Sequence, residues 1–178
     1  METINSDKKE RRFLSSKIMK DFIAIGIFSF GYNFITTAEY VHFRQIFEAA
    51  NFTSSIQISI LLAVAIGSFC LGIVFGGIVN DSMRTKFGQR APAILFGGLV
   101  ASLGFLVIPL VTLFVNNTTT AFILLLIIFI IANLGLGGAF APWLALVSDL
   151  FNKEERTYAG IAIIAFSAIG AIIAMLFF

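Results

Sequence analysis

The sequence predicts an all-α membrane protein with five transmembrane helices. Hydrophobic residues make up 58% of the 178-residue chain and its mean hydropathy is +0.97, which is more apolar surface than a soluble domain of this size can bury. Charged residues account for 12% and gather between long apolar runs. A helix that crosses a bilayer needs about 20 apolar residues. Five runs are of about that length: Phe22–Tyr40, Ile56–Val79, Ala93–Val115, Thr120–Val147 and Ala159–Phe178.

A polar tail, residues 1–21, precedes the first apolar run. It lacks the apolar core and small-residue cleavage site of a signal peptide. We therefore expect the first span to act as an uncleaved anchor of a multi-pass protein of the cell membrane. The chain then divides into a cytoplasmic tail, 1–21, and one transmembrane helical domain, 22–178.

The distribution of Lys and Arg predicts the orientation of the spans. Of the 12 basic residues, eleven precede span 1 or lie between spans 2 and 3 or spans 4 and 5, and Arg44 is the exception. Cytoplasmic connections retain Lys and Arg during insertion, so the amino terminus and these two connections are predicted to be cytoplasmic. Because the cations are explained in this way, no nucleic-acid partner is indicated.

Polar residues form a stripe along span 1. Ser29, Asn33, Thr36 and Tyr40 recur at spacings of three or four, with Tyr32 beside them. Lipid offers no hydrogen-bond partners, so the stripe should face protein or a water-filled cavity. Hydrogen bonding between helices and contact with a solute are both open interpretations.

Ionisable residues near the outer end of span 1 do not predict catalysis. Glu39 is the one carboxylate that could approach a cavity, but we expect an interfacial, solvated acid. His42, the single histidine, has no pair of intramembrane acids and no cluster of metal ligands beside it, so no enzyme activity is predicted. Glu154 and Glu155, in the connection before span 5, are interpreted as solvated loop charges.

Spans 2 and 4 carry packing signals. Ser68, Gly72 and Gly76 repeat every four residues in span 2, a ridge that permits close approach of another helix. In span 4, Pro142 removes a backbone hydrogen bond, so a kink or local break is expected there.

A polar and an aromatic residue flank the stretch of span 4 that contains Pro142. Asn133 is the strongly polar residue in the span's core, and Trp143 follows the proline directly. Broken helices mark binding sites in several transporter folds. Trp143 could stack on a sugar ring, and an interfacial anchor is the alternative.

The connection between spans 2 and 3 reads "NDSMRTKFGQRAP", from Asn80 to Pro92. Its three basic residues are explained as topological anchors. Asp81 is not, because a carboxylate at the C-terminal end of a helix faces the negative end of the dipole; Asp149 stands in the same position after span 4. We expect both acids to form ion pairs or to contact the N-terminus of another helix.

Two motifs carry a resemblance to a known family. "GGIVNDSMRTKFGQRAP" resembles the loop signature of the major facilitator superfamily, with Asp81 four residues after Gly77 and a basic, Gly-containing turn. "APWLALVSDLFNKEERTYAG", from Ala141 to Gly160, is similar to the end of the fourth helix in the glycoside-pentoside-hexuronide:cation symporter branch. The resemblance covers nearly the whole chain and the first five helices of that family's twelve.

The resemblance implies roles for particular residues. Helices 1 and 4 line the central cavity in this superfamily, which implies solute contact for Tyr32, Asn33, Thr36, Asn133 and Trp143. The two loop motifs imply a cytoplasmic gate formed by Gly77, Asp81, Arg84, Lys86, Gly88, Arg90, Asp149 and Arg156. No cofactor or metal is expected, and the coupling ion, proton or sodium, is not assigned.

The favoured function is secondary active transport of a small organic solute, such as a sugar, by alternating access. The alternative is a non-transporting membrane subunit or a truncated, non-functional half transporter. The last span ends on an apolar run with no polar tail, so we interpret the N-terminal bundle as incomplete. Its expected partners are lipid, the solute, and either a missing C-terminal half or a second copy of the chain.

Overall fold

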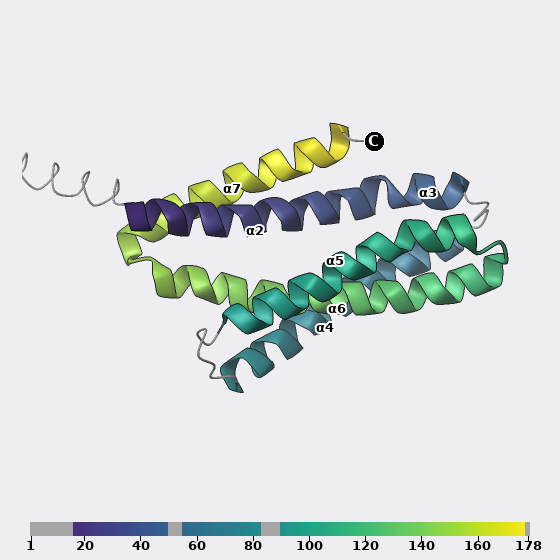
Figure 1. Cartoon of the computed structure of the whole chain (residues 1–178), viewed down its shortest axis with the longest axis horizontal. Helices are drawn as coiled ribbons and strands as arrows, with labels where there is room; N and C mark the ends of the chain where they lie inside the picture. Colours follow the sequence, from purple (N-terminus) through teal and green to yellow (C-terminus); the bar gives the residue numbers. More distant parts are fainter. Residues whose placement is uncertain (1–15, 50–54, 83–89, 177–178) are drawn as a thin grey trace, which may run out of the picture.

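A computed structural model describes residues 16–49, 55–82 and 90–176, and every regular element in these ranges is an α-helix. Arg84, Lys86 and Gly88, predicted to belong to the gate, lie outside the described residues. The described residues form six helices, and Figure 1 shows them running roughly along the long axis of the molecule. They are α2 (Ser16–Val41), α3 (Phe43–Ala49), α4 (Ser55–Ser82), α5 (Ala91–Phe114), α6 (Thr118–Leu150) and α7 (Lys153–Leu176).

Five candidate membrane spans confirm the predicted fold class. The span in α2 runs on through α3 to Gln45, and α4, α5, α6 and α7 supply the other four. Each is long and apolar enough to cross a bilayer. The short helix α3 continues from α2 after a turn at His42.

The start of α7 corrects one sequence-based interpretation. The helix begins at Lys153, before the expected Ala159, because a cap closes its first turn. The backbone N–H of Asn152 donates to the Glu155 carboxylate over 3.1 Å, the reciprocal half of a capping box. Glu154 and Glu155 lie in the first turn, where acids favour the helix dipole. They are helix residues rather than loop charges.

Asn117 caps the N-terminus of α6. Its side-chain oxygen accepts a hydrogen bond from the backbone N–H of Thr120 at 3.1 Å, as an N-cap residue does. The helix then continues without interruption past Pro142 to Leu150, so α6 has no local break there, and the alternative, a kink, stays a prediction. Pro142 is fully buried.

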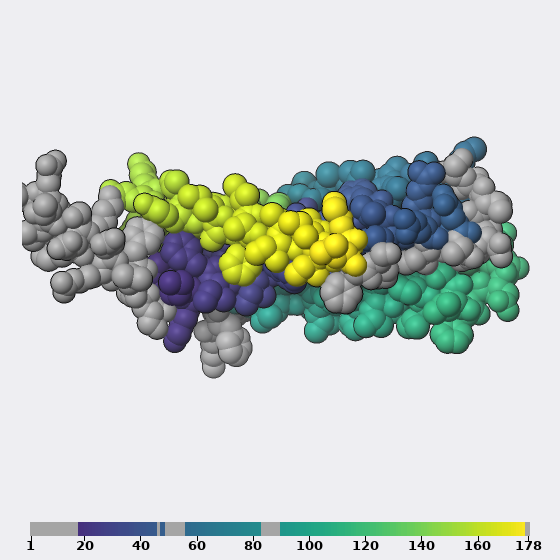
Figure 2. All heavy atoms as spheres, turned by 90° about the horizontal axis from the view of Figure 1, so that it is seen from above, coloured from purple at the N-terminus to yellow at the C-terminus, as the bar shows by residue number. Residues whose placement is uncertain are grey.

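The helices pack in two layers. In the first layer α7 lies along α2, as Figures 1 and 2 show from two directions; in the second, α6 packs closely against both α4 and α5. The predicted ridge of span 2 makes the α4–α6 contact possible. A Cβ atom added at Gly76 would lie 2.6 Å from the Gly138 Cα atom, so the two backbones touch.

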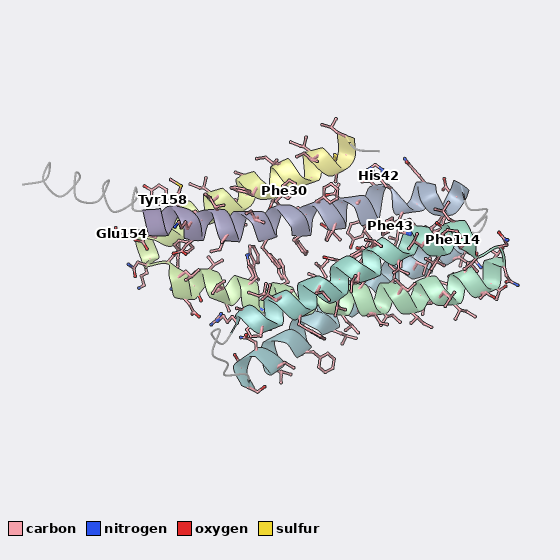
Figure 3. The ribbon with its side chains drawn as sticks, viewed as in Figure 1. Phe30, His42, Phe43, Phe114, Glu154 and Tyr158 are labelled. Carbon is pink, nitrogen blue, oxygen red and sulfur yellow. The ribbon has the colours of Figure 1, made fainter. Side chains whose placement is uncertain are left out.

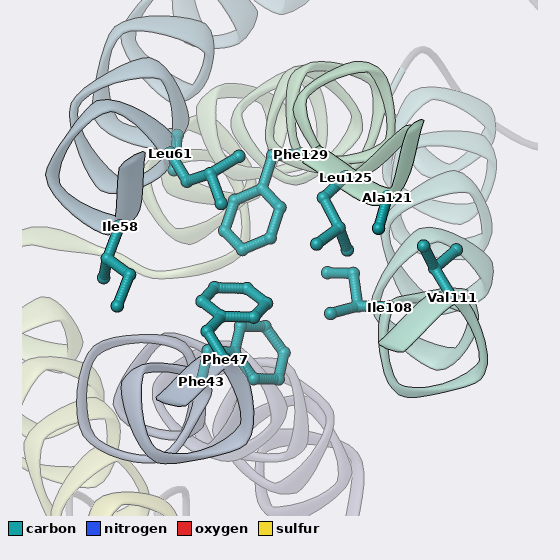
Figure 4. Close-up of a cluster of buried hydrophobic side chains, with 10 residues drawn as sticks. Phe43, Phe47, Ile58, Leu61, Ile108, Val111, Ala121, Leu125 and Phe129 are labelled. Atoms are coloured by element: carbon teal, nitrogen blue, oxygen red, sulfur yellow. The ribbon is translucent and has the colours of Figure 1, made fainter. Parts of the chain in front are cut away.

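Two apolar clusters join the layers, one near each end of the bundle. In the Phe129 cluster, Phe43 and Phe47 of α3 insert toward α4, α5 and α6 (Figure 4). We call this side, where Phe114 lies, the Phe114 end (Figure 3). At the opposite Phe151 end, the Trp143 cluster is made of Ile25, Trp143, Phe151 and Ala159.

Candidate functional site

A cavity of about 410 Å³ lies between the two apolar clusters, bounded by α2, α4, α6 and α7. Four of the five residues predicted to contact solute line it: Tyr32, Asn33, Thr36 and Asn133. Trp143 does not. The remaining lining residues are Thr37, Glu39, Tyr40, Val41, Ile66, Phe69 and Met175.

Glu39 is buried, which corrects the expectation of a solvated, interfacial acid. The residue is 1% exposed and Asn133 is 3% exposed. The Asn133 side-chain amide donates to the Glu39 Oε1 atom over 3.0 Å. The second N–H of that amide donates to the Phe129 carbonyl oxygen. Asn133 lies near the middle of α6, so the pair joins the two layers deep within the span.

The polar stripe of α2 has a structural role as well. The Ser29 hydroxyl hydrogen-bonds with that of Ser167 on α7 and donates to the Ile163 carbonyl oxygen. Asn33 donates from Nδ2 to the Ser167 hydroxyl at 2.8 Å. Ser29 and Asn33 therefore form hydrogen bonds between helices, which was one of the two interpretations of the stripe. The Thr36 hydroxyl donates within its own helix, to the Tyr32 carbonyl oxygen.

Aromatic rings connect the cavity wall to the Trp143 cluster. The Tyr32 ring lies 4.8 Å from that of Phe140 and 5.9 Å from that of Phe69. Phe140 in turn contacts Trp143, which stacks on Phe28 with ring centroids 5.0 Å apart. Trp143 is 4% exposed and packs in the interface between α2 and α6. Its ring is thus separated from the cavity by Phe140.

His42 lies where α2 passes into α3, next to the last turn of α7 (Figure 3). It is buried, and its Nε2 atom is 2.9 Å from the Ala174 carbonyl oxygen. This contact fixes the end of α7 against the helix junction, close to the cavity residue Met175.

An ion pair lies at the Phe151 end, among the residues predicted to form a gate. Arg90 Nε is 2.8 Å from Asp149 Oδ2, with the side chains 21% and 53% exposed. The expected ion pair of Asp149 is confirmed.

Arg156, another predicted gate residue, closes the C-terminal end of α6. Its guanidinium donates to the carbonyl oxygens of Ser148 and Phe151 over 2.8 and 3.1 Å, as basic side chains do at helix C-termini. Asp81 is exposed at the end of α4. A Cβ atom added at Gly77 would meet no described residue within 4 Å.

Sequence reasoning missed Ser167 and the burial of Glu39. A signal for Glu39 was present, because it follows Thr36 by three residues and so continues the polar stripe toward the Phe114 end. Ser167 is a lone hydroxyl in an apolar span. Its role depends on the close pairing of α2 with α7, which no local pattern indicates.

The arrangement is that of a multi-pass helical membrane protein with a cavity of mixed polar and apolar lining between helices of both layers. The chain belongs to the Major Facilitator Superfamily, because the model of that family matches residues 21–178. The superfamily is one of membrane transporters, so the chain is a transporter-family protein. No curated protein and no solved structure matches it.

Proposed function

We propose that the chain supplies the solute-binding cavity of a secondary active transporter for a small organic solute. The observation that carries the proposal is the 410 Å³ cavity lined by Tyr32, Asn33, Thr36 and Asn133. A cavity of this size and mixed lining is typical of small-molecule sites. Its place between helices of two layers suits alternating access, in which bundles rock about a central site.

The Arg90–Asp149 pair and the Arg156 contacts support a gate at the Phe151 end. In the proposed cycle these contacts form when that end is closed and break when it opens, as in other switching transitions. We propose that this end is cytoplasmic, on the distribution of basic residues.

The sugar class and the glycoside-pentoside-hexuronide:cation symporter branch rest on the two loop motifs. Hydroxyl and amide groups on α2 and α6 could hydrogen-bond a neutral polyol. The proposed transporter also uses a coupling ion, either a proton or sodium. A partner completes it, either another copy of the chain or a separate helical bundle.

Equilibrium dialysis with the purified chain in lipid nanodiscs tests the binding step. The labelled probes are a hexose, a neutral amino acid and choline. Thr36→Phe places a ring in the cavity without removing a hydrogen bond between helices, and should weaken binding of the accepted probe about tenfold or more. Thr112→Phe is the matched control, because the Thr112 hydroxyl also donates within its own helix, to Pro109, and does not line the cavity.

Saturable binding that Thr36→Phe weakens and Thr112→Phe spares would support a solute site. The absence of saturable binding by every probe would favour the alternative, a non-transporting subunit. Equal loss in both variants would show that the ring disturbs the bundle in general and would count against this cavity.

A further inference from the structure

We propose that the cavity takes a small alkylammonium ion, with its positive charge against the Glu39 carboxylate. This inference rests on the proposed function and narrows its solute class. It follows from three features of the cavity: a buried acid, the lack of a lining base, and a set of aromatic rings.

Among the described residues, the charge of Glu39 has no basic partner in the cavity. The described lining residues include no Lys, Arg or His. Within the described ranges, Arg44 forms an ion pair with Glu48 and Arg90 forms one with Asp149, at the two ends of the bundle. A carboxylate buried in an apolar surrounding requires a proton or a compensating cation.

Hydrogen bonding leaves one side of the carboxylate for a ligand. Asn133 donates to Oε1 and spends its other N–H on the Phe129 carbonyl oxygen. Among the described residues, the bond from Asn133 to Oε1 is the side-chain hydrogen bond that Glu39 makes. The other carboxylate oxygen, Oε2, therefore has no donor among these residues. An ammonium ion supplies the missing positive charge, and a primary ammonium also supplies N–H donors.

The surrounding residues fit a cation with an organic body. Tyr32, Tyr40 and Phe69 line the same cavity, and aromatic faces attract alkylammonium ions. The described cavity-lining residues from the other helices are uncharged: Ile66 and Phe69 from α4, Asn133 from α6 and Met175 from α7. An anion would meet the carboxylate with no opposing base, so anions should be excluded.

Fluorescence of the single tryptophan tests the proposal. Trp143 contacts Phe140, which contacts Tyr32 in the cavity wall, so occupancy should change its emission. The full chain in nanodiscs is titrated with choline, with the neutral analogue in which carbon replaces the nitrogen, and with glucose. We expect a saturable response to choline. The affinity for the neutral analogue should be lower by a factor of about ten or more.

Glu39→Gln keeps an oxygen that can accept the Asn133 hydrogen bond and removes the charge. It should abolish the difference between choline and its analogue, whereas Glu48→Gln, which changes an exposed acid paired with Arg44, should preserve it. Far-UV circular dichroism and size-exclusion profiles identify any variant that fails to fold. In that event the choline-to-analogue ratio of the unaltered chain decides.

Equal affinity for choline and the neutral analogue would overturn the inference, as would no saturable response to choline. A saturable glucose response that Glu39→Gln leaves unchanged would also overturn it. That last result would leave the proposed function intact and favour a neutral sugar. Failure of every probe would contradict both.

Discussion

Among single residues, Glu39 and Asn133 should matter most for stability, because they place a carboxylate and an amide inside the contact between the two layers. Asn133→Leu removes the donor of a 3.0 Å hydrogen bond and leaves Glu39 buried without it. We expect the free energy of unfolding to fall by about 1–3 kcal/mol, the cost of a buried polar group that loses its partner.

Denaturant titration followed by Trp143 fluorescence measures this change. The double variant Glu39→Leu with Asn133→Leu is the control, since replacing both members by apolar groups should restore much of the lost stability. A double variant that is less stable than Asn133→Leu would mean that the pair does not act as one unit.

The ion pair of Arg90 with Asp149 makes a second prediction at this scale. In a Cys70→Ser background, Val147→Cys provides a reporter that packs against the Trp143 cluster. If the pair holds the Phe151 end closed, Asp149→Asn should speed labelling of this cysteine by a water-soluble maleimide. Glu48→Gln, which breaks an ion pair at the Phe114 end, should have no effect. Equal labelling rates in the reporter protein and its two variants would show that the Arg90–Asp149 pair does not hold the Phe151 end closed.

Among the helices, close backbone contact between α4 and α6 decides which substitutions the bundle tolerates. A Cβ added at Gly137 would collide with the Phe69 carbonyl oxygen and approach the Ile73 nitrogen to 2.9 Å. Gly137→Ala should therefore force the two helices apart and cost about 1–3 kcal/mol or more. Gly77→Ala meets open space among the described residues and is the matched control.

Thermal unfolding of both variants, followed by circular dichroism, makes the comparison. We expect a clearly lower melting temperature for Gly137→Ala and a nearly unchanged one for Gly77→Ala. Similar values for the two would contradict the packing of α4 on α6.

The sequence predicts the spans well and their ends less well, for a physical reason. Apolar length alone determines which segments can cross a bilayer, whereas the start of α7 depends on the Asn152–Glu155 cap in a charged stretch. Likewise α6 runs past Pro142 without interruption, although proline removes one backbone hydrogen bond from a helix. The cavity lies between these cases: residue spacing indicated the stripe on α2, but only the tertiary arrangement buries Glu39.

For the whole molecule, the orientation in the membrane remains a prediction from the basic residues. Reporters fused after Lys20 or within residues 84–90 should be cytoplasmic, and one placed within 116–120 should be external, because cytoplasmic connections retain Lys and Arg. Alkaline phosphatase, active outside, and a fluorescent protein that folds inside give complementary readouts. The reverse pattern would invert the assignment of both ends and of the gate.

The whole molecule also predicts a separation of binding from transport. Alternating access requires one bundle to rock against another around the site, and the described helices provide one set of cavity walls. Tyr40, which lines the cavity, is 49% exposed, and hydrocarbon offers such a group no hydrogen-bond partner. We therefore expect a second protein surface to cover this side.

The 178-residue chain reconstituted by itself into liposomes should bind its solute yet show no saturable uptake, with or without a sodium or proton gradient. Gradient-driven, saturable uptake by the chain alone, sensitive to Thr36→Phe and not to Thr112→Phe, would show instead that copies of this bundle complete the site among themselves.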